Sequence, residues 1–330
     1  MQNIFDVTRQ NAEEIFENKY GAKGINLAEL QSKHPDMKND IVLPKCYRNP
    51  RELLVVAHAL GFGIYGPTLI QTLENNEHWE DVGYTVQKGN CNDGDEMEIF
   101  RPKENSPLTV SEKQSIEDII QYYKATTFEE EINWVCTEIG KNITEDRLRP
   151  DDIVVICLDD RNARSYFSDI SRKLMDKDIY TNNLSSNNYQ KGFQDDNRIT
   201  LSTVYRAKGN EAPMIYVIGA DAFGRDRLSK KMRNKIFTAF TRAKAWLRVS
   251  GMGDGMELLI NEIDQATEKL PYLYFDHKSE KAINRDLAEI NAKESQQMEK
   301  IASFLNQEAE KLGIDLDDLL EIMKKSGKDE

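Results

Sequence analysis

Two segments of the chain bring together residue types that bind phosphate. Residues 200–219, TLSTVYRAKGNEAPMIYVIG, form two strand-like runs separated by a basic turn, a glycine and an acid. We expect this loop to leave the carboxyl edge of a strand, where backbone N–H groups and short hydroxyls are exposed. Gly209 allows the backbone to approach a ligand closely.

The second segment, residues 237–251, reads FTAFTRAKAWLRVSG and places Arg242 near the expected end of a helix. A planar guanidinium there can meet a γ-phosphate through two hydrogen bonds and stabilise transition-state charge. Two shorter segments precede these: Lys45–Pro50 contains Arg48, and Gln2–Asp6 contains Phe5, whose ring can stack on a nucleic-acid base.

In this order the four segments resemble motifs three, four, five and six of superfamily-one DNA helicases of the UvrD/Rep kind. The motif-five resemblance rests on Thr203, Lys208, Gly209 and Glu211, and the motif-six resemblance on the run from Thr241 to Lys244 with Leu247. The chain departs from the family pattern at three positions: Val7 replaces a tryptophan, Tyr205 a histidine and Asn210 a leucine.

The resemblance implies a role for each candidate residue. Catalytic contacts to the γ-phosphate would come from Arg48 and Arg242. Nucleotide contacts would come from Gln2, Gly209 and Glu211, with Glu211 facing the ribose. DNA contacts would come from Phe5, Thr203, Tyr205 and Lys208. The family generally moves 3′ to 5′ along single-stranded DNA.

The chain lacks the G-x-x-x-x-G-K-[ST] loop that binds ATP in such motors. Gly61–Thr68 has the glycine spacing but carries Pro67 in place of the lysine, and acidic residues follow Gly94. ATP and Mg²⁺ would therefore be held mainly by an N-terminal helicase half, and this chain would not hydrolyse ATP alone. Met1 falls inside the third motif, so we expect a fragment or a split subunit.

Two other function classes stay open at this stage. A degenerate helicase fold without ATPase partnering would act as a DNA- or protein-binding adaptor. An independent nucleotide-binding enzyme would use Asp159 and Asp160, which end an apolar run, as metal ligands. We interpret that run as a core strand with a solvated end and expect no metal site. No cysteine or histidine cluster suggests zinc.

The alternation of predicted strands and helices indicates an α/β fold with a parallel sheet. The helicase resemblance implies that this sheet is RecA-like and flanked by helices. Helices are predicted over 51–60, from Thr127, over 161–176 and over 225–242. Strands are predicted at 41–43, 83–86, 97–100, 153–158, 199–204, 214–218 and 247–250. Thr127 and Glu130 form a capping-box pattern, and the purely apolar run at 153–158 is typical of a central parallel strand.

The domain organisation follows from the motif order. Residues 1–66 and 151–254 are predicted to form the motor domain, and 67–150 an inserted accessory region. Residues 255–330 form a helical tail, which packs on its own chain, binds a partner or forms a loose coiled coil. The net charge of −13 and pI near 5.0 argue against a protein that coats nucleic acid broadly. Without a signal core or a long apolar run, we expect a cytoplasmic protein that contacts no membrane.

Overall fold

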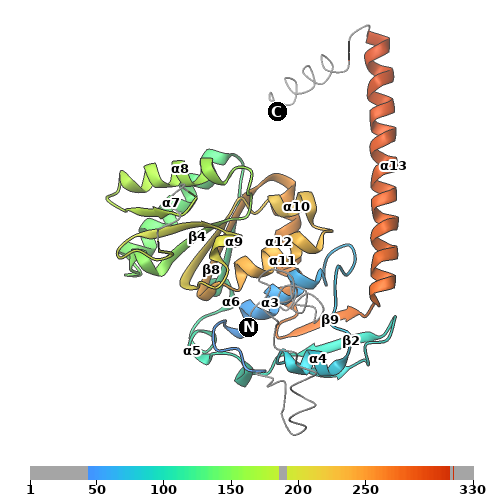
Figure 1. Cartoon of the computed structure of the whole chain (residues 1–330), viewed down its shortest axis with the longest axis horizontal. Coiled ribbons are helices and arrows are strands. Elements are labelled where there is room, and N and C mark those ends of the chain that lie inside the picture. Colours follow the sequence, from blue (N-terminus) through green and yellow to red (C-terminus); the bar gives the residue numbers. More distant parts are fainter. Residues whose placement is uncertain (1–43, 186–191, 313–314, 316–330) are drawn as a thin grey trace, which may run out of the picture. The chain divides into compact units, whose positions relative to one another are not determined.

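The computed structural model describes residues 44–185, 192–312 and 315. These belong to two compact units, Met1–Ser279 and Glu280–Glu330 (Figure 1). The expected strand at 41–43 and the candidate residues Gln2 and Phe5 lie outside the described residues.

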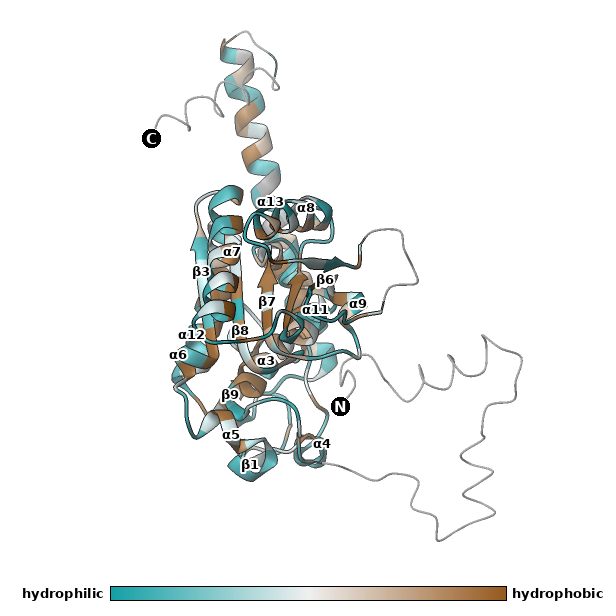
Figure 2. Cartoon of the chain, turned by 90° about the vertical axis from the view of Figure 1, so that its left-hand side faces the viewer, coloured by the Kyte–Doolittle hydropathy of each residue, from teal (hydrophilic) through white to brown (hydrophobic). Residues whose placement is uncertain are grey.

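The first unit is built on a six-stranded parallel sheet of order β3-β8-β7-β4-β6-β5. Its strands are β3 (Ile120–Ala125), β4 (Ile153–Cys157), β5 (Thr181–Asn183), β6 (Ile199–Thr203), β7 (Ala212–Ile218) and β8 (Ala243–Met252). Every residue of β4 is buried, as expected for a strand covered on both faces. The central strands form the hydrophobic middle of the unit in Figure 2.

Helices cover both faces of the sheet. On one face, α7 (Phe128–Thr144) and α8 (Ala163–Met175) pack against β4, β6 and β7. On the other face, α11 (Lys230–Phe240) contacts β7 and β8, and α12 (Gly253–Glu268) contacts β8 and β3 (Figure 1). This arrangement confirms the expected α/β class with a parallel sheet flanked by helices, as in RecA-like domains.

Helix α3 (Arg51–Phe62) confirms the helix predicted over 51–60, and all of its residues from Leu53 onward are buried. It packs against α11 and α12, and a small antiparallel sheet contacts it through β9. That sheet has the order β1-β2-β9 and consists of β1 (Thr85–Lys88), β2 (Glu96–Phe100) and β9 (Tyr272–Asp276). Gly63 ends α3 in the left-handed conformation, with φ of 75°, which glycine adopts without steric cost.

Short elements complete the first unit. They are α4 (Asn76–Asp81), η1 (Lys103–Asn105), α5 (Leu108–Ser111), α6 (Ile116–Ile119), η2 (Pro150–Asp152), α9 (Val204–Ala207) and α10 (Ala222–Asp226). Thr127 caps α7 by accepting a hydrogen bond from the backbone of Glu130, as its sequence pattern predicted.

Several elements differ from the prediction. Residues 120–144, expected within the inserted region, contribute β3 and α7 to the parallel sheet and its helical layer. The expected tail contains β9, which pairs with β2 more than 170 residues earlier in the chain. The helix predicted over 225–242 is two helices, α10 and α11, and Arg242 follows the second one.

The second unit is described from α13 (Glu280–Leu312). This helix spans 33 residues, and the side chains of Ile301, Phe304 and Leu312 are exposed. The helical C-terminal region is thus confirmed. Within the described residues, no helix combines the length and the apolar composition that crossing a bilayer requires.

Candidate nucleotide-facing site

Three loops far apart in the sequence bring Arg48, Glu211 and Arg242 together. The Arg48 guanidinium forms an ion pair with the carboxylate of Glu211, and the Lys244 ammonium lies 3.5 Å from the same carboxylate. Arg48 precedes α3, Glu211 immediately precedes β7, and Arg242 immediately precedes β8. Because β7 and β8 are parallel neighbours, the site lies at the amino ends of these two strands.

Arg242 is buried at 6% exposure, and backbone oxygens hold its guanidinium. Its Nε donates to the carbonyl of Thr238 at 3.0 Å, and an Nη donates to the carbonyl of Asn210 at 3.4 Å. Burial and the neighbouring Arg48 charge lower the pKa of Arg242 to about 10, against the opposing effect of Glu211. The guanidinium is therefore charged at neutral pH. Among the described residues, no carboxylate forms an ion pair with it.

The other motif-five residues follow β6 at its carboxyl end. Thr203 ends β6, level with Cys157 of β4 and hence with Ile218 of β7. Tyr205 lies on the short helix α9 and is 58% exposed. Gly209 has a φ of 88°, and an added Cβ would meet no atom within 4 Å.

The whole motif-five loop was expected at the carboxyl edge of the sheet, and this is wrong for Glu211. The loop after Thr203 returns across the sheet and reaches the amino end of β7 at Ala212. The candidate DNA-contacting residue Thr203 and the candidate nucleotide-contacting residue Glu211 therefore lie at opposite ends of the strands. A parallel connection must make this return, so one loop serves both ends.

Two residues at the site had been assigned no role from the sequence. Lys244 shares the Glu211 carboxylate, and Asn49 joins the loop of Arg48 to the loop of Arg242 through two hydrogen bonds. Lys244 was visible as a motif residue without an assigned role. Asn49 lies in the segment that resembles motif four, but it was assigned no role, because its partners lie almost 200 residues away.

The carboxylates considered as metal ligands are engaged by protein groups. Asp159 accepts hydrogen bonds from Asn162 and the backbone of Arg161, and it pairs with Arg225 at 2.8 Å. Burial raises the pKa of Asp159, but these hydrogen bonds outweigh burial and leave the pKa lowered. Asp160 pairs with Lys235 at 2.7 Å. In the part of the chain that the structure describes, no three His, Cys, Asp or Glu side chains are grouped for a metal ion.

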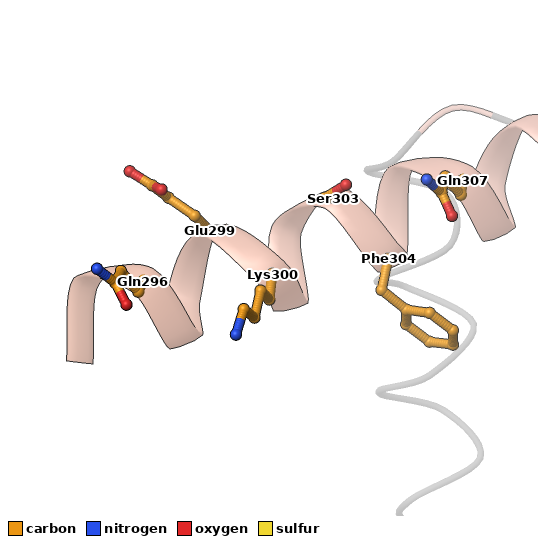
Figure 3. A pocket seen from close by; sticks show the side chains of 6 residues that line it. All are labelled: Gln296, Glu299, Lys300, Ser303, Phe304 and Gln307. Atoms are coloured by element: carbon orange, nitrogen blue, oxygen red, sulfur yellow. The ribbon is translucent and has the colours of Figure 1, made fainter. Parts of the chain in front are cut away.

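A surface hollow of about 400 Å³ lies on α13 of the second unit (Figure 3). It is lined by Gln296, Glu299, Lys300, Ser303, Phe304 and Gln307. All six residues come from one helix, and none belongs to a motif. The hollow therefore adds nothing to the candidate site.

Residues 198–250 match the family model of the UvrD-like helicase C-terminal domain. The matched range includes β6, β7, α11 and most of β8, and it carries Thr203, Glu211 and Arg242. The C-terminal domain of a possible DNA helicase from Lactobacillus plantarum WCFS1 is a similar solved structure. The two share 16% sequence identity, and the match covers 46% of this chain and 84% of that chain with a TM-score of 0.34. The comparison with curated proteins gave no match. The family match confirms the UvrD-like resemblance of the segment with motifs five and six.

Proposed function

We propose that the first unit serves as the second motor domain of an ATP-dependent DNA helicase. In this role Arg48 and Arg242 contact the γ-phosphate of an ATP molecule, which an N-terminal P-loop domain holds with Mg²⁺. The observation that carries the proposal is the grouping of Arg48, Lys244 and Arg242 around Glu211. Arg48 and Lys244 form ion pairs with this carboxylate, and all of these residues except Arg48 lie in the segment that matches the UvrD-like model. The protein would work on cytoplasmic DNA.

The charge balance of the site supports this role. Arg48 and Lys244 share the single carboxylate of Glu211, and Arg242 is buried beside them without an ion pair among the described residues. The cluster therefore has a surplus of positive charge in a chain of net charge −13. A γ-phosphate presented from another domain would supply the missing negative charge, and arginine is suited to bind it through two hydrogen bonds.

Single-stranded DNA is the proposed substrate at the opposite ends of the strands. Tyr205 offers an exposed ring for base stacking, and Thr203 and Lys208 are near it in the chain to contact phosphates. Gln2 and Phe5 keep their proposed roles toward nucleotide and base. Closing on ATP and reopening after hydrolysis would move the two motor domains along the strand.

The test is the ATPase rate of the chain mixed with a P-loop half of a UvrD-like helicase and single-stranded DNA. Arg242→Lys removes the planar fork but keeps the charge, and we expect it to lower kcat at least about a hundredfold. Arginine fingers contribute roughly 10³ to 10⁵ in related phosphoryl transfers.

The matched control is Arg248→Lys. Arg248 is also buried, and it also donates to backbone carbonyls, those of Asp118 and Leu247, at 3.0 and 3.1 Å. The Arg248→Lys variant should keep kcat within about twofold of the original value, because only Arg242 is proposed to contact the transition state. ATP hydrolysis by the chain alone would contradict the proposal. An unchanged rate for Arg242→Lys would favour the adaptor function instead.

A further inference from the structure

Asn49 connects the loop of Arg48 to the loop of Arg242. Its side chain is 3% exposed, and its amide nitrogen donates to the carbonyl of Thr241 at 3.0 Å and to the carbonyl of Ala243 at 2.6 Å. These two carbonyls belong to the residues on either side of Arg242. Both amide hydrogens of Asn49 are therefore used to hold the segment that carries Arg242.

The same contacts extend to the third loop of the site. The backbone carbonyl of Arg242 accepts a hydrogen bond from the backbone of Ala212 at 3.2 Å, and Ala212 follows Glu211. Glu211 in turn pairs with Arg48, which precedes Asn49 in the chain. The three loops thus form a closed circuit, in which the Asn49 side chain binds the backbone on both sides of Arg242.

We propose that Asn49 is a positioning residue that fixes the separation between the Arg48 and Arg242 guanidinium groups. This inference rests on the proposed function, since it gives that separation a purpose. Two like charges held side by side repel each other, so the loops need a neutral clamp that does not consume either charge. An asparagine amide with two donors meets this need, because it binds backbone carbonyls and uses no donor of either guanidinium group.

A merely structural role would make Asn49 equivalent to any buried asparagine with the same bonding. The chain contains such a residue in Asn182, which is 2% exposed and donates to the carbonyls of Gly192 and Phe193 at 3.1 and 3.3 Å. Asn182 lies on the edge strand β5 and has no part in the arginine site. Asn182→Ala is therefore the matched control for Asn49→Ala.

The first measurement uses the full chain without nucleotide. Hydrogen exchange of the Arg242 Nε–H, followed by NMR, reports whether its hydrogen bond to Thr238 is held in place. We expect Asn49→Ala to accelerate this exchange about tenfold or more and Asn182→Ala to leave it unchanged, because only the first variant releases the loop. Equal exchange in the two variants would overturn the proposal. Asn49→Asp keeps the side-chain shape and removes the donors, so it must behave like Asn49→Ala.

The second measurement is the ATPase rate in the mixture with a P-loop half and single-stranded DNA, well below the thermal midpoint of each variant. We expect Asn49→Ala to lower kcat about tenfold or more with KM for ATP within about twofold, because a finger displaced by about 1 Å loses transition-state contacts while the other domain binds ATP. A loss that Asn182→Ala matches would overturn the positioning role. If Arg242→Lys lowers kcat and Asn49→Ala does not, the positioning role fails alone; if neither does, the proposed function fails.

Discussion

Glu211 is the carboxylate that Arg48 and Lys244 share, and both ion pairs involve partly exposed side chains. Glu211→Gln leaves these cations and Arg242 without a nearby negative charge. Inorganic pyrophosphate should then bind the full chain more tightly, by about tenfold, because it no longer competes with the carboxylate and is no longer repelled by it. The measurement is a titration with pyrophosphate at low salt, which gives the concentration that produces half of the maximal rise in the thermal unfolding midpoint.

The control for this residue-scale prediction is Glu257→Gln. Glu257 pairs with Lys124 at 2.6 Å on an exposed part of the surface, so its removal changes net charge equally without touching the site. Pyrophosphate affinity should stay within about twofold of the original. An identical gain in both variants would mean that only the net charge matters.

Helix α3 contains a buried histidine that makes its packing sensitive to pH. His58 lies against Phe62 and Phe237, and its Nδ1 is 2.8 Å from the Tyr84 hydroxyl. Burial, followed by the nearby Arg101 charge, lowers the pKa of His58 to about 3. Between about pH 6.5 and pH 3, His58 is therefore protonated in the unfolded chain but neutral in the folded chain. The free energy of unfolding should fall as pH drops from about 6.5 towards 3, by up to about 1.4 kcal/mol per pH unit.

Urea unfolding at pH 7, 6 and 5 measures this slope for the original chain and for His58→Gln. Glutamine keeps a hydrogen-bonding side chain near Tyr84 but does not titrate. The variant should therefore lose less stability on acidification. Below pH 6, the slopes of unfolding free energy against pH should differ by an amount that corresponds to uptake of up to one proton on unfolding. Equal slopes for the two proteins would show that His58 is not the group responsible. Burial raises the pKa of Tyr84, so the hydroxyl that faces the histidine stays neutral over this pH range.

Helices α10 and α12 approach each other through glycines. A Cβ added at Gly255 would lie 2.3 Å from the carbonyl oxygen of Asp221, and one at Gly224 would lie 2.5 Å from the Cα of Gly255. Gly255→Ala should lower the free energy of unfolding by about 1–3 kcal/mol or more, because backbone has to move. Gly255 lies in the first turn of α12, which begins at Gly253, so the close contact is made at the start of the helix.

Chemical denaturation measures the loss, with Gly253→Ala as its control. Gly253 has a φ of 57°, but an added Cβ would meet no atom within 4 Å. The Gly253→Ala variant should lower the free energy of unfolding by only about 1 kcal/mol, which is the strain of a left-handed backbone at alanine. A larger cost at Gly253 than at Gly255 would contradict the close approach.

The elements show which features local sequence can predict. The apolar run of β4 and the Thr127 cap of α7 depend on neighbouring residues, and both are confirmed. β3 was missed because only Ile120 and Ala125 of this edge strand are buried, so it lacks the continuous apolar run that marks β4. β9 was missed because its identity depends on pairing with the distant β2.

At the scale of the whole molecule, the candidate site could be approached only through the motif resemblance. Arg48, Glu211 and Arg242 are separated by about 30 to 190 residues, and no local periodicity relates them. Their convergence depends on the parallel order of β7 and β8 and on the placement of the loop before α3. Asn49 belongs to the motif-four segment, but its role could not be inferred for the same reason, since its backbone partners lie almost 200 residues away.

The charge of the whole molecule also shapes how it would bind DNA. A net charge of −13 repels a polyanion at long range, so the proposed contact to single-stranded DNA must come from a few local groups. If Lys208 contacts one phosphate, Lys208→Ala should reduce the slope of log affinity against log salt concentration by about 0.7. Fluorescence anisotropy of a labelled oligothymidine with the full chain measures that slope. Lys124→Ala changes the net charge equally, but Lys124 lies on β3 and pairs with Glu257 of α12, so the slope for this variant should stay unchanged. A slope that falls equally in both variants would place the DNA contact in the general field of the protein and not at the motif-five loop.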